Sequence, residues 1–391
     1  MNAPRRVLLN DVAVIERDIV DPTAIVSGTK YVGLENIESG GRFVGVRAVD
    51  AGELASSKFA FTPQHLLYGK LRPYLAKIAR PDFEGICSTD ILPVRPGPDL
   101  DRAYLAWLLL TPEMLARASS LAAGANLPRL SPQVLLDLKI PLPPLPDQWR
   151  IAEILDKADA LRAKRRAALA QLDTLTQSIF LDIHREAAKS QRVIPLAQIA
   201  AASRGAFVNG PFGSDLLTQE LQDEGVPVIY IRDIRDGEYR RVSKSCVSER
   251  KAHDLAVCTV TAGDVLVAKV GDPPGIAAVY PAGNPPAVVT QDVIRIRVER
   301  EVASPEFVVG YLNSSIGKWK VAGITVEATR ARFSLGEFKG LRIELPSVKL
   351  QHDYARRIAA VNEVRAAHRE SLAELDALFA SLQHRAFRGD L

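Results

Sequence analysis

Two proline-rich turns come nearest to a known catalytic pattern in this chain. Asp272-Pro273-Pro274-Gly275 and Asn284-Pro285-Pro286-Ala287 begin like the Asp/Asn-Pro-Pro-aromatic loop that holds a flipped adenine for methylation. Both lack the aromatic residue that would stack on the base, and no glycine-rich strand-to-helix fingerprint for a nucleotide cofactor accompanies them. We therefore interpret both segments as ordinary proline turns.

Patterns for phosphate binding, metal binding and acid catalysis are also incomplete. Gly69-Lys70 and Gly317-Lys318 lack the upstream glycine and the following Ser or Thr of a P-loop. The six histidines are scattered and no HExxH sequence occurs, so we expect no metal site. Asp90 and Asp292 could act as acids, but nothing in the sequence pairs them with a nucleophile or a metal ligand. We therefore expect no catalytic residues and no cofactor in this chain.

The composition indicates a soluble cytoplasmic protein with more than one domain. A chain of 391 residues exceeds one ordinary core, so we expect two or three domains. The net charge of +4 permits a polyanionic partner without requiring one. Cys87, Cys246 and Cys258 form no CxxC pair, which argues against a disulfide framework and fits a reducing compartment. Acidic residues interrupt the start of the chain, and no apolar run is long enough for a signal peptide or a membrane span.

The chain contains one internal duplication, which organises everything else. The segment IPLPPLPDQWRIA, beginning at Ile140, aligns without a gap with IELPSVKLQHDYA, beginning at Ile343. One register held over so many positions indicates two copies of one unit. The same register pairs Arg129 with Arg332, Gln148 with Gln351, Arg162 with Arg365, Asp173 with Asp376, and Leu175 with Leu378.

Upstream the two copies keep the same order with weaker identity. Short β-branched runs bounded by Gly, Pro and Asp predict strands, and helices are expected near residues 101–121 and 304–320. We therefore predict an α+β class, with one small mixed domain in each half. The upstream correspondences are LENIESGG from Leu34 with IRDIRDGE from Ile231, Lys70 with Lys269, and AYLAWLLL from Ala103 with EFVVGYLN from Glu306.

Each copy ends in a long apolar stripe with helical spacing. No Gly or Pro interrupts residues 147–190, so we expect a helix of about 40 residues and about 60 Å, and a second from about Leu350. Neither helix can bury its stripe alone, so we expect the two to pack as an antiparallel coiled coil with pseudo-twofold symmetry. The stripes alone would equally fit a dimerisation coiled coil. The residues that we expect to form packing or partner-docking surfaces are Ile154, Leu161, Leu169, Leu172, Leu175, Ile358, Val364, Leu372, Leu375 and Leu378.

A mixed domain, a proline-marked exit and a long helix, all occurring twice, resemble the specificity subunits of Type I restriction–modification systems. Gly210-Pro211-Phe212-Gly213-Ser214 is similar to a phrase that often opens the target recognition domains of this family. The first half lacks that phrase. The segments from Leu142-Pro143 to Gln148 and from Leu345-Pro346 to Gln351 resemble the entry to the family's conserved helices. The ending from Gln383 resembles the family's usual C-terminus.

The resemblance implies a division of the chain and a role for each part. It implies target recognition domains at 1–145 and 191–346, and conserved spacer helices at 146–190 and 347–391. Each recognition domain would read one half of a split, asymmetric DNA site, and the helices would set the gap. Two modification (methyltransferase) subunits would bring S-adenosylmethionine, and restriction subunits would use ATP and Mg. The alternatives are a two-domain scaffold that never meets DNA and a self-contained methyltransferase.

Base reading and phosphate contact require cationic or amide side chains at loop tips. The two halves offer such residues at partly matching places, and the resemblance adds two from the glycine-phenylalanine phrase. The residues that we expect to contact DNA are Lys70, Arg72, Asn126 and Arg129 in the first half, and Phe212, Ser214, Lys269, Arg330 and Arg332 in the second.

Overall fold

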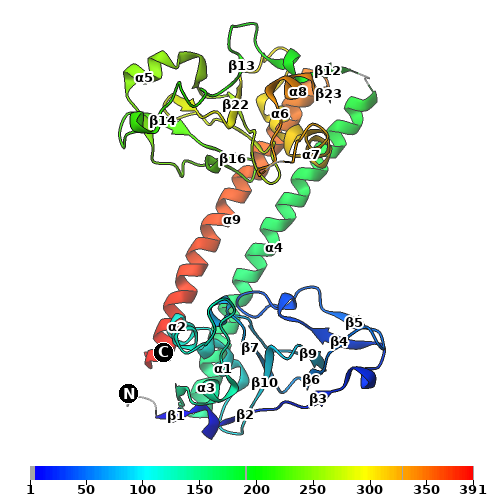
Figure 1. Cartoon of the computed structure of the whole chain (residues 1–391), viewed down its shortest axis with the longest axis vertical. Helices are drawn as coiled ribbons and strands as arrows, with labels where there is room; N and C mark the ends of the chain where they lie inside the picture. Colours follow the sequence, from blue (N-terminus) through cyan, green and yellow to red (C-terminus); the bar gives the residue numbers. More distant parts are fainter. Residues whose placement is uncertain (1–4, 190–191, 328, 391) are drawn as a thin grey trace. The chain divides into compact units, whose positions relative to one another are not determined.

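The chain forms two compact units, each made of a globular part and portions of two long helices (Figure 1). A computed structural model describes residues 5–189, 192–327 and 329–390. The first unit comprises Met1–Ala167 with Glu370–Leu391, and the second comprises Ala168–Arg369. The helices α4 (Leu145–Lys189) and α9 (Val348–Arg388) each contribute to both units.

The globular part of the first unit contains two main sheets and three short helices. The antiparallel sheet has the order β2 (Ala13–Ile15), β10 (Ile91–Pro96), β7 (Leu66–Gly69), β8 (Ile78–Ala79). The second sheet has the order β3 (Ile19–Val20), β6 (Lys58–Phe61), β9 (Gly85–Cys87), β4 (Thr29–Val32), β5 (Arg47–Val49), with β4 and β9 parallel. A strand pair, β1 (Arg6–Leu8) with β11 (Lys139–Pro141), and the helices α1 (Arg102–Leu109), α2 (Pro112–Ser120) and α3 (Pro132–Leu136) complete it.

The second unit repeats most of this topology, but its described residues form no counterpart of β3. Its antiparallel sheet has the order β13 (Phe207–Asn209), β22 (Val293–Ile296), β19 (Val265–Ala268), β20 (Ala277–Val279). Its other main sheet has the order β17 (Cys246–Val247), β14 (Val226–Ile229), β21 (Ala287–Val289), β18 (Thr259–Val260), with β14 and β21 parallel. The remaining elements are β12 (Val193–Pro195) with β23 (Arg342–Glu344), the hairpin β15 (Ile234–Arg235) and β16 (Glu238–Tyr239), and the helices α5 (Glu249–Asp254), α6 (Pro305–Asn313), α7 (Ser315–Ala322) and α8 (Leu335–Gly340).

The helices expected near 101–121 and 304–320 are confirmed, but each is divided in two. Asp101 caps α1 by accepting from the backbone N–H of Tyr104, and Thr111 caps α2 in the same way. Ser304 and Ser314 cap α6 and α7. A second cap so soon after the first ends one helix and starts another, because the capping residue takes an extended backbone.

Within each unit the portions of α4 and α9 pack antiparallel, as the sequence predicted. In the first unit Arg162 donates from Nε to Asp376, at 2.6 Å. In the second unit Arg365 contacts Asp173 at 3.2 Å. The internal duplication pairs Arg162 with Arg365 and Asp376 with Asp173, so both units use the same arginine–aspartate contact with the helices exchanged.

Not all of the predicted stripe is buried between the helices. Ile151 and Leu155 of α4 pack in the core of the first unit with Phe379 of α9. Arg162 covers the Phe379 ring at 4.2 Å from its centre, which places a cation inside the seam. Leu161, Leu175, Val364 and Leu378 are 45–52% exposed and lie outside the packed seam.

A buried glutamine attaches each helix to its globular part. Gln148 is fully buried and accepts from Asp101 N at 2.8 Å, and it donates to the carbonyl oxygens of Asp99 and Pro143. Gln351 does the same in the second unit: it accepts from Ser304 N at 2.8 Å and donates to two carbonyl oxygens. The side-chain amide thus replaces the backbone partners that an extended segment lacks.

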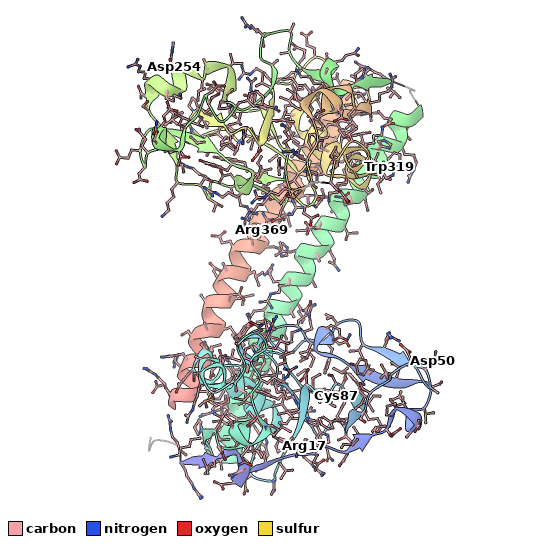
Figure 2. All side chains as sticks on the ribbon, viewed as in Figure 1. Arg17, Asp50, Cys87, Asp254, Trp319 and Arg369 are labelled. Atoms are coloured by element: carbon pink, nitrogen blue, oxygen red, sulfur yellow. The ribbon has the colours of Figure 1, made fainter. Side chains whose placement is uncertain are left out.

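The cysteines agree with the expectation of no disulfide framework. Cys87, Cys246 and Cys258 are free thiols. Cys87 lies in the interior of the first unit (Figure 2), where burial raises the pKa of its thiol to about 12. Among the described residues, no helix is both long and apolar enough to span a membrane.

A polar cluster in the second unit makes stability depend on pH. Lys320 contacts both carboxylate oxygens of Glu344, at 2.8 and 2.9 Å, and Tyr311 donates a hydrogen bond to the same group. Burial raises the pKa of Glu344, but the bonds from Lys320 and Tyr311 outweigh it and hold that pKa at about 2. A carboxyl whose pKa is lowered by folding stabilises the fold above its unfolded pKa, and that contribution is lost as the pH falls through its folded pKa.

We therefore expect the free energy of unfolding to fall between about pH 4.5 and pH 2 because Glu344 takes up a proton. The loss is about 2 kcal/mol, since the side chain is a quarter exposed and solvent weakens the interaction. Urea unfolding at pH 5 and pH 3 should show a smaller loss for Glu344→Gln than for the wild type. Glu224→Gln, at an exposed position, should keep the full loss; an equal loss in Glu344→Gln would contradict the assignment.

Candidate nucleic-acid interface

In the first unit the predicted DNA-contacting residues meet where two loops pair. The chain leaves β7 at Lys70, whose carbonyl accepts from Leu130 N at 2.9 Å. Arg72 N donates to Pro128 O at 2.7 Å, and an Arg72 guanidinium nitrogen lies 3.5 Å from Asn126 O. The structure therefore brings together Lys70, Arg72, Asn126 and Arg129, which we call the basic edge of the first unit.

Asp90 orients two cations of this edge. The Asp90 carboxylate lies 3.2 Å from Arg129 Nε and 3.9 Å from Lys70 Nζ. Lys70 N also donates to Asp90 O, at 2.9 Å. Asp90 therefore holds Lys70 and Arg129 in place. This gives a structural role to an acidic residue for which the sequence offered no catalytic partner. Arg129 keeps 47% of its side chain exposed, so its guanidinium remains accessible to a partner.

The second unit builds the same edge at the matching place. Lys269 N donates to Asp292 O at 2.8 Å, and Gly271 N donates to Ala331 O at 3.2 Å. Arg332 pairs with Val270 as an isolated bridge, as Arg129 pairs with Leu71. The loop that carries Arg330 and Arg332 therefore lies beside the loop that follows β19. Lys269, Arg330 and Arg332 form the basic edge of the second unit.

The glycine-phenylalanine phrase begins at this edge of the second unit. Gly210 N donates to Val293 O, and a Cβ at Gly210 would lie 2.2 Å from Thr290 O, so only glycine fits there. The phrase thus leaves β13 where β22 begins, beside the Lys269 loop. Phe212 is 64% exposed and its carbonyl accepts from Asp215 N, which closes a turn that leaves Ser214 exposed.

Each edge combines exposed guanidinium groups with amide, hydroxyl or aromatic groups on loops held by a sheet. Such groups suit phosphate contact and base-edge reading. Among the described residues, no three His, Cys, Asp or Glu side chains gather to hold a metal ion. Sequence reasoning did not identify Tyr74, which is 55% exposed at the first edge; a lone tyrosine beside Pro73 carries no motif.

The predicted docking residues occupy two environments. Leu161 and Leu378 in the first unit, and Leu175 and Val364 in the second, are exposed, and the duplication relates the two pairs. Each unit therefore has a matching pair of exposed apolar residues on its helix portions. The remaining predicted docking residues are partly buried: Ile154, Leu169, Leu172, Ile358, Leu372 and Leu375.

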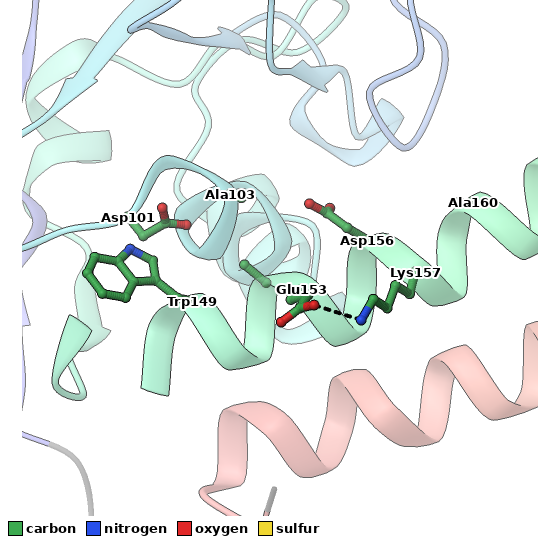
Figure 3. A pocket seen from close by; sticks show the side chains of 8 residues that line it. Asp101, Ala103, Trp149, Glu153, Asp156, Lys157 and Ala160 are labelled. Carbon is green, nitrogen blue, oxygen red and sulfur yellow. Dashed lines mark hydrogen bonds and ion pairs between the residues drawn. The ribbon is translucent and has the colours of Figure 1, made fainter. Parts of the chain in front are cut away.

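A shallow pocket lies beside the first turns of α4 (Figure 3). Its volume is about 460 Å³, and Trp149, Ala103 and Ala152 are among its lining residues. Trp149 is 57% exposed, and Glu153 pairs with Lys157 at its edge. Of its other acidic lining residues, Asp101 caps α1 and Asp156 pairs with Arg80. Trp149 adds an aromatic surface to the exposed face of α4.

Relatives of known role share both the sequence pattern and the fold. A model of the Type I restriction modification DNA specificity domain matches residues 29–171. The EcoDI specificity subunit of Escherichia coli is 30% identical over 162 residues, 40% of this chain and 36% of that protein. The EcoBI specificity subunit of Escherichia coli is 25% identical over 316 residues, 72% of this chain and 64% of that protein. The matches therefore span less than two thirds of these two curated relatives.

Two solved structures have the same fold. The S subunit of a Type I restriction–modification system from M. genitalium superposes with a TM-score of 0.59 at 14% identity, over 99% of this chain and 96% of that one. A chain from a study of complex assembly and conformational transition of the type I R-M system gives 0.55 at 20% identity, over 100% and 99%. The resemblance is thus confirmed: this chain is similar in sequence to the specificity subunits of Type I restriction–modification systems, and it has the fold of solved S subunits.

Proposed function

We propose that this chain is the DNA-reading specificity subunit of a Type I restriction–modification complex. Each unit would read one half of a split, asymmetric site through its basic edge. The observation that carries this proposal is the recurrence of one edge in both units. Each edge has a lysine directly after the third strand in the order of the antiparallel sheet, and an arginine bridged to the residue that follows this lysine. Two similar but unequal edges suit two unequal half-sites.

The partners follow from the helix surfaces. We propose that two modification (methyltransferase) subunits dock on the exposed pairs Leu161–Leu378 and Leu175–Val364. These subunits would bind S-adenosylmethionine and flip the target adenines, and restriction subunits would use ATP and Mg for translocation and cleavage. This chain would contribute no catalysis of its own and would act on DNA in the cytoplasm.

Co-expression with a modification subunit from a neighbouring reading frame tests the proposal. Methylation mapping across genomic DNA should show adenine methylation at one split, asymmetric motif with a fixed gap. A stable complex that leaves DNA unmethylated and shows no site preference would support a protein scaffold instead. Binding of S-adenosylmethionine by the isolated chain would support a self-contained methyltransferase.

Loss of the matched arginines should affect one half-site each. We expect Arg129→Ala and Arg332→Ala to weaken binding of the assembled complex about ten-fold, because a good arginine contact to a base or phosphate contributes about 1–3 kcal/mol. Competition binding with duplexes altered in one half-site should show that each variant tolerates changes in only one half. Arg47→Ala is the matched control, because Arg47 lies on β5, is 62% exposed and pairs with Glu53. Wild-type binding by both edge variants would remove the edges from the interface.

A further inference from the structure

The basic edge of the first unit also carries an exposed aromatic side chain, Tyr74, which has no role in the function proposed above. Tyr74 lies in the middle of the short 3-10 turn η4 (Pro73–Leu75), directly after Arg72. Its side chain is 55% exposed, and the adjacent Leu75 is 37% exposed. An exposed ring beside cations on a loop is the arrangement by which proteins contact unstacked or partly unstacked bases.

The turn that carries Tyr74 has a fixed shape. Arg72 and Ala76, on either side of it, have φ values of 51° and 52°, which side chains other than glycine rarely adopt. Two backbone bonds hold these positions: Arg72 N to Pro128 O at 2.7 Å and Gly40 N to Ala76 O at 3.0 Å. Strained residues of this kind persist where neighbours impose them, and they gather at binding sites.

The charge around the turn favours a nucleic acid. Arg72 immediately precedes the turn, Lys70 lies two residues earlier in the same loop, and Arg129 is bridged to Leu71 between them. Asp90 is the acid paired to Lys70 and Arg129. The Nε atom of Arg72 is buried and donates to no acceptor within the described part of the chain. A buried N–H without an acceptor favours a shift of the Arg72 side chain toward an outside acceptor, and a phosphate oxygen is an acceptor that suits this edge.

The second unit places its aromatic side chain differently. Gly275, two residues before β20, matches Ala76, two residues before β8, and has a φ of 96°. Pro273 therefore stands where the first unit has Tyr74. At the second edge Phe212, which arrives from the loop after β13, is 64% exposed. Each edge thus carries an exposed aromatic residue, and the two come from different loops.

We propose that Tyr74 wedges its ring against the bases of the first half-site and partly unstacks one base step. Tyr74 is then a specificity-determining residue, because flexible pyrimidine–purine steps open at lower cost than stiff ones. Phe212 would play the matching part in the second half-site. The inference rests on the proposed function, since it requires that the first edge contact DNA.

The test uses the complete complex with its modification subunits and duplexes that carry 2-aminopurine at successive positions of the mapped first half-site. We expect the fluorescence to rise at one step with the wild type and with Tyr74→Phe, and to stay at the free-duplex level with Tyr74→Ala. Affinity should fall about ten-fold for Tyr74→Ala, the scale of one stacked base, and stay within about two-fold for Tyr74→Phe. Ile19→Ala, at a more exposed apolar residue of the same unit (71% exposed), is the control.

Three outcomes separate the inference from the proposed function. A rise at the target adenine comes from base flipping by the modification subunit and should not depend on Tyr74. If the wild type methylates a split site but Tyr74→Ala leaves every fluorescence signal unchanged, the wedge is wrong and the specificity role stands. If Tyr74→Phe loses as much as Tyr74→Ala, the hydroxyl and not the ring makes the contact, and the wedge is again wrong. If the wild-type complex binds no DNA, both fail.

Discussion

A complex whose two long helices are each lengthened by four residues should methylate the same two half-sites with a longer gap between them. The insertions belong between Ala167 and Ala168 in α4 and between Arg369 and Glu370 in α9, where the chain passes from one unit to the other. Four residues add about 6 Å to a helix and turn it by little more than one full turn. At about 3.4 Å per base pair along a strand, the gap should grow by one or two base pairs.

The half-sites should stay the same because both basic edges lie inside their units. The helix contacts Arg162–Asp376 and Arg365–Asp173 also lie inside their units, so the insertion leaves them intact. A two-residue insertion at the same places is the control, since it turns each helix by more than half a turn and should abolish methylation. Methylation mapping reads both results. An unchanged gap after the four-residue insertion would show that the helices do not measure the site.

The architecture could be predicted from the sequence because the chain presents it twice. One register from Arg129 to Leu175 and from Arg332 to Leu378 predicts two units of one topology, and the apolar stripes predict two helices that pack. The identical order of the antiparallel sheets and the parallel pairs β4–β9 and β14–β21 agree with the duplication, and β3 is the strand of the first unit without a counterpart. The duplication aligns Gln148 with Gln351, but the sequence does not predict that they anchor the helices, because a hydrogen bond to a loop leaves no periodic pattern.

The arrangement of the side chains at the basic edges could not be predicted from the sequence, because it depends on hydrogen bonds between loops. Lys70 and Arg72 lie more than 50 residues before Asn126 and Arg129, and a backbone pairing between two loops brings the two pairs together. The position of Tyr74 depends on two left-handed residues, and the sequence marks neither with a glycine. The exposure of Leu161 and Leu175 depends on which side of α4 faces α9 in each unit. Periodicity identifies a stripe, but it does not say which leucines at its border stay accessible.

Replacing Gln148 by leucine should destabilise the first unit by about 3 kcal/mol or more. The change leaves Asp101 N without its acceptor, and the carbonyl oxygens of Asp99 and Pro143 without their donor. Each buried polar group that loses its partner costs about 1–3 kcal/mol. Urea unfolding can report on this unit alone, because Trp107 is buried there and the chain has only two other tryptophans. Trp149 (Figure 3) and Trp319 (Figure 2), both exposed, would be replaced by phenylalanine.

Gln148→Glu separates the hydrogen bonds from the shape of the side chain. Glutamate keeps the size of the side chain and the acceptor for Asp101 N, but it turns an oxygen instead of an NH₂ toward two carbonyl oxygens. It should therefore lower the free energy of unfolding of the first unit at least as much as leucine does. Gln171→Leu, at an exposed position of α4, should change the free energy of unfolding by less than about 0.5 kcal/mol. Gln351→Leu should act mainly on the second unit and move the Trp107 transition less than Gln148→Leu does. If Gln148→Leu left the Trp107 transition in place, the attachment of α4 to its globular part would rest on apolar packing alone.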